Sequence, residues 1–515
     1  MKTRWLKTTA LAVGFAAVCL TSVAQHRFTA EQKEQDFEYL CKTLKENYPY
    51  FGVLQRQTGR DWLANHDRYL QMIRETTDDK SFVTAVQAIM HEIGCGHAYV
   101  IAPHMFDRMS GLYHQAAVTP GKENKIYRRW AAVYDRARPY YDYFKELYGI
   151  EPAGEEQSAA NGDSGYDPSG NVSLAMLGDG KIGVLTINSF GNPSADSAWL
   201  VTCLDSVQGC EHLIIDLRKN SGGNDQYWTE NIMPRLISRT YKWNGPSVVR
   251  RGSVSGTWYE KRFRSFKKVV SLPNLPAEVT SEDFAVIMDK RVVRPQGRSG
   301  FRGKVWLFVG PRVFSSSESF TAFTKATGWA TIAGTRTGGD GIGSDPIPMM
   351  LPGSGLLVNF PAWGGLNPDG SFNFEARTTP DVAITAASNA EALADLVHYI
   401  DPTVEVPVAA GPHVVGVGPF ENGAQDVDPA VTEIRFRFSE PMHGFSFGYG
   451  PLGPEAFPEI VRAGSGYSED GLELTLAVKL KPETEYQIQV LEGLKLRNKK
   501  GVSVEGYQLS FKTRK

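Results

Sequence analysis

The first 150 residues carry apolar side chains at helical spacing. Apolar residues recur every three or four positions, as in the series Phe37, Leu40, Leu44 and Tyr48 and the series Phe82, Val86 and Met90. This spacing places each series on one face of a helix. We therefore predict a mostly helical region over residues 25–150, with a long helix over residues 127–147.

A second pattern begins after a polar, low-complexity stretch over residues 154–170, which predicts a loop or linker. Strands are predicted at 181–187, 211–217, 305–309, 330–334 and 356–360, and helices at 195–207, 225–238, after Ser317 and at 390–400. This alternation predicts an α/β core over residues 171–404, with a mainly parallel sheet covered by helices. Residues 242–302 interrupt the alternation with basic and aromatic side chains, and we expect them to form a solvated β-hairpin.

The pattern changes again after a linker-like stretch over residues 407–412. Short strands are predicted at 433–438, 472–476, 485–490 and 508–512. Even strands separated by turns predict a β-sandwich over residues 412–515. The phrases Phe438-Ser-Glu-Pro-Met442 and Leu480-Lys-Pro-Glu-Thr-Glu-Tyr486 resemble the Ig-like modules of bacterial secreted proteins.

The start of the chain has the pattern of an export signal. A basic start is followed by an apolar run over residues 8–20, which is too short for a mature membrane span, and by the small residues Ser22-Val-Ala24. We predict a signal peptide over residues 1–24 and a periplasmic or extracellular protein. Cys19 leaves a lipoprotein anchor open, so membrane attachment is expected only if Cys19 is lipidated.

Composition restricts the class of partner. The 515 residues are 42% hydrophobic and 22% charged with a net charge of -2, which describes a globular protein and gives no reason to expect nucleic acid. The four cysteines after Cys19 leave room for two disulfides. They form no CxxC pair of the kind that structural zinc sites use.

A serine run marks the end of one predicted strand. Ser315-Ser-Ser-Glu318 follows the apolar run over residues 305–309 and Gly310-Pro311, and it precedes a predicted helix. A hydroxyl at such a junction lies near free backbone N–H groups, which is what a nucleophile and its oxyanion hole require. The same four residues also fit a capping box, Ser-x-x-Glu, that only starts a helix.

A glycine pair follows another predicted strand. Gly222 and Gly223 come after Asp216-Leu-Arg-Lys-Asn-Ser, where the carboxyl end of a parallel strand would open into a crevice. Glycines allow backbone N–H groups to point into that crevice. A tight turn between strand and helix explains them equally well.

Together these segments resemble the C-terminal processing peptidase and tricorn core family. Ile215-Asp-Leu-Arg-Lys-Asn-Ser-Gly-Gly223 is similar to its Asp-Leu-Arg-x-Asn-x-Gly-Gly motif, and Ser315-Ser-Ser-Glu-Ser-Phe320 to its motif Ser-Ala-Ser-Glu-x-Phe. Residues 330–339 resemble its downstream strand and glycine turn, so that the likeness extends over residues 180–384. The resemblance implies a crotonase-like ββα core and a serine-type peptidase. It also implies Ser315 as nucleophile, with the amides of Ser316 and of Gly222 or Gly223 as oxyanion hole.

The family uses two kinds of general base. Processing peptidases have a lysine 25 residues after the serine, and Asp340 in this place excludes that mechanism. The tricorn-like branch takes a histidine from a phrase ending Gly-x-x-His, which Gly94-Cys-Gly96-His97 resembles, although the tricorn peptidase has serine where Gly96 stands. Its orienting carboxylate precedes a Pro-Asp pair, as Glu375 precedes Pro380-Asp381 with a spacing one residue short. By resemblance we expect His97 as base and Glu375 as its orienting partner.

A metalloprotease helix is the alternative for this histidine. His91-Glu92 would need its second histidine four residues after the first, whereas His97 comes six residues later and beyond two glycines. We therefore expect neither a metal nor another cofactor.

The sequence leaves three functions open. The first is an exported serine peptidase that hydrolyses peptides or unfolded proteins. The second is a binding protein on a peptidase scaffold, like the family's retinoid-binding relatives, which would hold peptides or apolar ligands. Asp340, Gly96 and the short spacing to Glu375 are what such a decayed site would show. The third is an adhesin whose working part is the Ig-like module.

Overall fold

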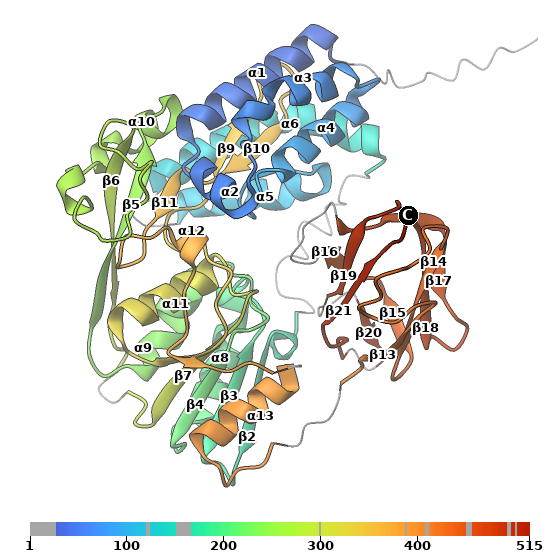
Figure 1. Cartoon of the computed structure of the whole chain (residues 1–515). Coiled ribbons are helices and arrows are strands. Elements are labelled where there is room, and N and C mark those ends of the chain that lie inside the picture. The colour runs from blue at the N-terminus through green and yellow to red at the C-terminus, as the bar shows by residue number, and fades with distance from the viewer. Residues whose placement is uncertain are drawn as a thin grey trace, which may run out of the picture.

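A computed structural model describes most of the chain (Figure 1). The described residues are 27–119, 124–150, 166–297, 300–386, 389–406, 411–449, 456–491, 496–499 and 502–515. The expected signal peptide with Cys19, most of the polar stretch over residues 154–170 and most of the linker over residues 407–412 lie outside them. In Figure 1 the N-terminal helices lie above the parallel sheet, and the C-terminal strands lie to one side.

A six-stranded sheet forms the centre of the α/β part. Its order is β12-β8-β7-β4-β3-β2, and every neighbouring pair is parallel except β2 with β3. The strands are β2 (Val172–Leu177), β3 (Ile182–Ile187), β4 (His212–Asp216), β7 (Lys304–Val309), β8 (Thr331–Gly334) and β12 (Val382–Ala383). The predicted α/β core with a mainly parallel sheet is therefore confirmed.

Helices cover both faces of this sheet. Alternate side chains of the strands pack on one face against α8 (Pro193–Ser206), the π-helix η4 (Tyr227–Ile232), α9 (Met233–Leu236) and α11 (Ser316–Thr327). The other side chains pack against α13 (Asn389–Ile400). Burial on both faces explains why the strands read as continuous apolar runs in the sequence.

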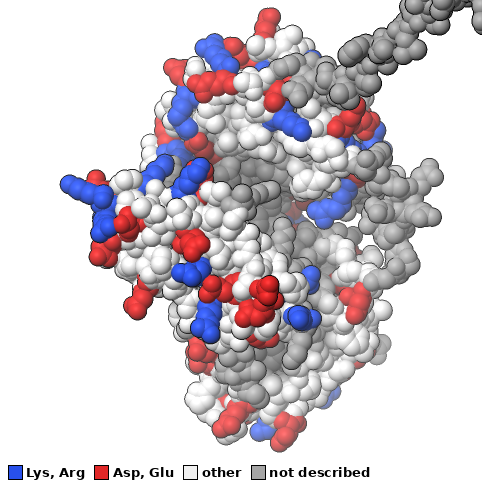
Figure 2. Space-filling model, turned by 90° about the vertical axis from the view of Figure 1, so that its right-hand side faces the viewer, with Lys and Arg blue, Asp and Glu red and all other residues white. Residues whose placement is uncertain are grey.

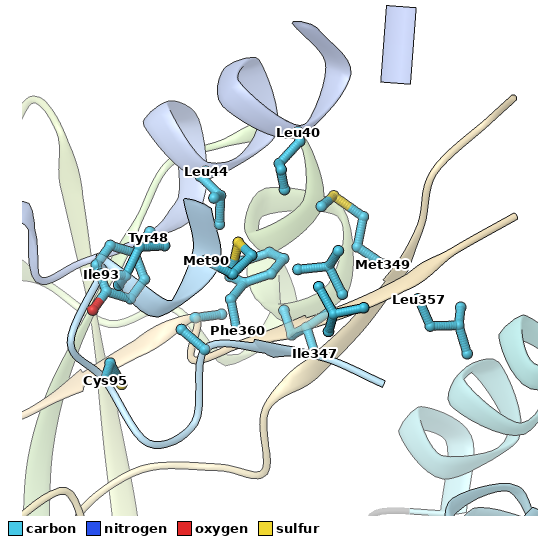
Figure 3. Packing of buried hydrophobic residues seen from close by; sticks show 14 of the residues in the cluster. Leu40, Leu44, Tyr48, Met90, Ile93, Cys95, Ile347, Met349, Leu357 and Phe360 are labelled. Carbon is cyan, nitrogen blue, oxygen red and sulfur yellow. The ribbon is translucent and has the colours of Figure 1, made fainter. Parts of the chain in front are cut away.

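The N-terminal region is helical, as its apolar spacing predicts. It contains α1 (Ala30–Asn47), α2 (Phe51–Thr58), α3 (His66–Arg74), α4 (Asp79–His91), α5 (Phe106–Val118) and α6 (Asn124–Tyr148). Its buried side chains share one hydrophobic core with residues from 248 to 374. Figure 3 shows this contact, in which Leu44 of α1 and Met90 of α4 face Ile347 and Phe360. The helical region is thus packed directly on two segments that connect strands of the parallel sheet, one between β4 and β7 and one between β8 and β12.

Two strand predictions differ from the structure. Residues 242–302 do contain an antiparallel pair, β5 (Tyr241–Arg250) with β6 (Phe284–Val293), but this pair is not solvated. β5 also pairs with β11 (Trp363–Gly365), and both strands bury much of their length in the shared core. β10 (Leu357–Phe360) joins β1 (Tyr99–Val100) and β9 (Ile347–Met350) in an antiparallel sheet instead of the parallel one. Apolar runs alone do not state which partner a strand will have.

The C-terminal part is rich in strands and has its own core. Its longer strands are β13 (Val414–Gly418), β14 (Glu433–Phe438), β17 (Glu459–Tyr467), β18 (Glu473–Lys479), β19 (Glu485–Val490) and β21 (Tyr507–Lys512), with β15 (Met442–Gly444), β16 (Phe447–Tyr449) and β20 (Leu496–Asn498) between them. The buried side chains of this core all come from residues 427–511. The Ig-like identity of this part stays a prediction.

Surface and cysteine chemistry add three observations. On the face in Figure 2, acidic and basic side chains are interspersed among uncharged ones.

The cysteines of the described residues are not paired. Cys41, Cys95, Cys203 and Cys210 are buried free thiols, so the two disulfides that the sequence left open do not form. Within the described ranges, no helix combines the length and apolar character that crossing a membrane requires.

Candidate active site

Ser315 stands at the junction between β7 and α11. It is the N-cap residue of α11, with φ 55° and ψ −123°, and its side chain makes no capping hydrogen bond. A positive φ is uncommon for a residue with a Cβ and occurs where surrounding structure imposes it, often at functional sites. The capping-box interpretation is therefore wrong, and the hydroxyl of Ser315 is available for another partner.

That partner is His97. Its Nε2 lies 3.0 Å from Oγ of Ser315, although the two residues are 218 positions apart in the chain. His97 follows α4 and precedes β1, and its ring packs on the ring of Phe314 with centroids 4.6 Å apart. A Cβ at Gly96 would stand 3.1 Å from Cζ of Phe314, so a side chain there would crowd the ring that supports His97.

Asp340 completes the line of contacts. Its Oδ2 lies 2.6 Å from Nδ1 of His97, and the residue is only 8% exposed. A carboxylate can only accept, so Nδ1 carries the hydrogen and Nε2 of a neutral ring is left to accept from Ser315. Gly339 holds the loop in place, because it forms a parallel bridge with Phe314 and accepts a hydrogen bond of 3.3 Å from the N–H of Ser315.

Glu375 does not contact His97, which corrects the expected orienting partner. Its two carboxylate oxygens accept from Nε and Nη2 of Arg56, at 2.8 and 2.6 Å. Arg56 also pairs with Glu278, so these three side chains join α2, α12 (Asn373–Ala376) and the loop before β6 at the surface. The spacing between Glu375 and Pro380-Asp381, which is one residue shorter than in the family, therefore belongs to a carboxylate that pairs with Arg56 and not with the histidine.

The glycine turn supplies one free amide beside Ser315. The N–H of Gly222 already donates to Oδ1 of Asn220 at 2.9 Å, so Gly222 is not the donor that the sequence left as an alternative. Within the described part of the chain, the N–H groups of Gly223 and Ser316 donate to no backbone carbonyl. These two amides are therefore free to bind an oxyanion.

The packing of this turn requires glycine. A Cβ at Gly222 would come 2.7 Å from the carbonyl oxygen of Phe314 and 2.9 Å from both Cβ of Ser315 and the nitrogen of Ser316. The turn therefore lies directly against the backbone of the serine segment. Gly222 has φ 106° and Gly223 φ 144°, a conformation that residues with side chains rarely adopt.

Glu318 has a structural position behind the serine. Its side chain is fully buried, and Oε1 accepts from Nδ2 of Asn373 at 2.7 Å and from Oγ1 of Thr378 at 2.6 Å. Burial raises its pKa from 4.5 to about 7. Asn373 in turn accepts from the N–H of Gly341 at 2.9 Å, so Glu318 connects α11 to the residue that follows Asp340.

Sequence reasoning missed two residues of this site. Asp340 stands where the processing peptidases have a lysine, and from the sequence it indicates only that the lysine mechanism is excluded. Tyr50, whose hydroxyl lies 3.1 Å from Oδ1 of Asp340, gave no signal other than its place in an apolar region.

Among the described residues, no group of three or more His, Cys, Asp or Glu side chains could hold a metal ion.

Comparisons with known proteins bear on the α/β core that carries this site. Residues 181–384 match the model of peptidase family S41. A solved structure from Parabacteroides merdae is 19% identical, with 72% of this chain and 96% of that chain covered and a TM-score of 0.45. The photosystem II D1 C-terminal processing protease is 15% identical over 69% of this chain and 94% of its own, with a TM-score of 0.35. The tricorn protease is 14% identical over 69% of this chain and 34% of its own, with a TM-score of 0.32.

The fold, the serine segment and the matched residues define a serine-type peptidase. The α/β core that carries Ser315 and the glycine turn coincides with residues 181–384, the part that the family model covers. This core is the part of the chain that is similar to peptidase family S41.

Proposed function

We propose that the protein is an exported peptidase that hydrolyses peptide bonds through a triad of Ser315, His97 and Asp340. The observation that carries the proposal is the pair of contacts on one imidazole: 3.0 Å from Nε2 to the serine and 2.6 Å from Nδ1 to the aspartate. A serine is activated when a base holds its proton and a carboxylate orients that base. The same contacts favour an intact site over the binding protein that the sequence left open.

The proposed reaction follows from the positions of the atoms. Oγ of Ser315 attacks the peptide carbonyl while its proton moves to Nε2 of His97, and the amides of Gly223 and Ser316 bind the oxygen that becomes negative. His97 then gives the proton to the leaving amine, which frees the amine and leaves an acyl-enzyme. Water attacks this ester with His97 as base, which releases the acid and restores the serine. Asp340 keeps the hydrogen on Nδ1 in every step.

The substrate class and the location belong to the same proposal. Peptides and unfolded proteins suit an enzyme whose chemistry acts on the backbone carbonyl and not on a particular side chain. The basic and apolar start of the sequence and the small residues at positions 22–24 support export to the periplasm or beyond. Cell fractionation and the N-terminal sequence of the recovered protein test the location, and an N-terminus at Gln25 is expected.

Replacement of the nucleophile tests the chemistry. Ser315→Ala should abolish both the cleavage of an unfolded protein and covalent labelling by a fluorophosphonate probe. Ser206→Ala is a matched control, because Ser206 lies on the exposed side of α8 and bonds only to the carbonyl of Thr202. Cleavage or labelling that persists in Ser315→Ala at the level of the control would contradict the proposal.

A further inference from the structure

Tyr50 reaches the active site from the N-terminal helical region. It precedes α2 as its N-cap residue and has no exposed surface. Its hydroxyl oxygen lies 3.1 Å from Oδ1 of Asp340 and 3.1 Å from the carbonyl oxygen of Trp363, and it accepts a hydrogen bond of 3.3 Å from the N–H of Gly365. One hydroxyl therefore connects the aspartate to β11, a strand outside the parallel sheet.

The hydrogen of this hydroxyl has a preferred acceptor. Burial in the first place, and the negative charge of Asp340 in the second, hold the pKa of Tyr50 well above its usual range, so the hydroxyl remains a donor. A carboxylate accepts more strongly than a neutral carbonyl, which favours Asp340 over Trp363. The N–H of Gly365 on the same oxygen polarises the hydroxyl further in that direction.

The two oxygens of Asp340 consequently have separate partners. Oδ2 accepts from Nδ1 of His97 at 2.6 Å and lies 3.7 Å from Sγ of Cys95. Oδ1 accepts from Tyr50. A buried carboxylate needs donors for both oxygens, and a fixed donor on one of them sets the plane in which the other meets the imidazole.

We propose that Tyr50 is a positioning residue of the peptidase: its hydroxyl fixes the carboxylate of Asp340 so that Oδ2 meets His97. This inference rests on the proposed triad and adds a part that the serine, the histidine and the aspartate do not contain. Tyr50 acts through Asp340 and touches neither the substrate nor the serine. The N-terminal helices then supply both the base and the support for its orienting carboxylate.

Tyr48 provides a matched control in the same turn. It is also fully buried, and its ring contacts that of Tyr50 edge-on with centroids 5.8 Å apart. Its hydroxyl lies towards Cys95 in Figure 3, whereas the side chains of Tyr50 and His97 are the ones within 3.1 Å of the carboxylate of Asp340. Loss of a hydroxyl at Tyr48 therefore removes the same atom from the same core and leaves the hydrogen bond from Tyr50 to Asp340 in place.

The test uses the full chain and a fluorophosphonate probe, whose labelling rate reports the activation of Ser315 without knowledge of the natural substrate. Tyr50→Phe should lower the labelling rate constant about 10- to 100-fold, because a misplaced catalytic group costs rate in this range. Tyr48→Phe should stay within about twofold of the unchanged protein. In the background of Asp340→Asn, Tyr50→Phe should produce no further loss, because the residue it positions is gone.

Each outcome decides between the two proposals. A rate for Tyr50→Phe within twofold of Tyr48→Phe, while Ser315→Ala abolishes labelling, contradicts the role of Tyr50 alone. An equal fold-loss with and without Asp340→Asn also contradicts it, since that result describes a general structural effect. If Tyr50→Phe does not fold, 3-fluorotyrosine at position 50 supplies the comparison, because it keeps the ring and the hydroxyl and makes the hydroxyl a stronger donor; a labelling rate unchanged by this replacement would contradict the role. Absence of labelling in the unchanged protein contradicts the proposed function itself.

Discussion

Oδ2 of Asp340 lies 2.6 Å from Nδ1 of His97. Asp340 occupies the chain position at which the processing peptidases that this sequence resembles have a lysine. The loop after β8 therefore brings an ionisable side chain to the active site. In this chain the side chain is a carboxylate, and it stands behind a histidine that comes from the other end of the sequence. Position 340 therefore belongs to the active site, but its side chain orients the base and is not itself the base.

Gly222 should be intolerant of even one added carbon. Gly222→Ala brings Cβ within 3.0 Å of atoms of Phe314, Ser315 and Ser316, and it demands a positive φ from alanine. We expect kcat to fall about 100-fold or more, the range for loss of an oxyanion donor, because the turn that carries Gly223 must move. Steady-state hydrolysis of a peptide measures this.

The control for that variant is a glycine in an open position. Gly111 lies within α5, and a Cβ there would meet nothing within 4 Å. Gly111→Ala should leave kcat unchanged and raise the free energy of unfolding by about 0.5–1 kcal/mol, as alanine does in a helix. If Gly222→Ala retained the kcat of Gly111→Ala, the assignment of the oxyanion site would be wrong.

Glu318 should make stability depend on pH. Its folded-state pKa of about 7 lies above the ordinary value of 4.5, so the folded chain holds an extra proton between these values. The stability that the neutral form contributes is complete below pH 4.5 and is lost as the pH rises through 7. Glu318→Gln cannot ionise and does not lose this stability. As the pH rises from 5 to 8, the free energy of unfolding of the variant should therefore increase by up to about 3 kcal/mol relative to that of the unchanged protein.

Urea unfolding at the two pH values measures that gain. Glu282→Gln serves as control, because Glu282 is exposed in the loop before β6 and its replacement should leave the difference between pH 5 and pH 8 as it is. A pH difference in Glu318→Gln equal to that of the unchanged protein would mean that Glu318 is ionised in its buried position.

The C-terminal strands should be dispensable for hydrolysis. The buried side chains of their core come only from residues 427–511, and none of the residues of the proposed triad belongs to it. A chain that ends at residue 406 should retain kcat/KM for a short peptide within about threefold, as expected of a domain with its own core. A loss beyond tenfold would show that these strands help to form the site.

The sequence predicted the parallel sheet because its strands are buried on both faces. Such strands are continuous apolar runs, as in Lys304–Val309, and they alternate with helices at regular intervals. The pairing of β10 with β1 could not be predicted in this way, because Tyr99 and its partner Asn359 lie 260 positions apart and such a distance leaves no local pattern. The antiparallel pair predicted within residues 242–302 is present, but its predicted exposure to solvent is wrong, because residues of both strands are buried in the core shared with the N-terminal helices.

The residues of the active site could likewise be predicted where a local motif contains them, and could not where the contact depends on the fold. Ser315, His97, Ser316 and Gly223 lie in short motifs that can be compared residue by residue, and the structure brings them together. The carboxylate has no such motif. The pattern around Glu375 looked suitable, but its oxygens are taken by Arg56, and only the three-dimensional fold places Asp340, 243 positions from His97, against the ring.

The central claim is that Asp340, and not Glu375, orients the base. The most direct measurement is kcat for Asp340→Asn and Glu375→Gln, determined side by side with one peptide substrate. An amide at position 340 can donate to Nδ1, which leaves the hydrogen on Nε2 and prevents it from accepting the serine proton, so kcat should fall about 10³- to 10⁴-fold. Glu375→Gln weakens only a partly exposed ion pair and should keep kcat within about threefold. A large loss in Glu375→Gln with kcat preserved in Asp340→Asn would contradict the account.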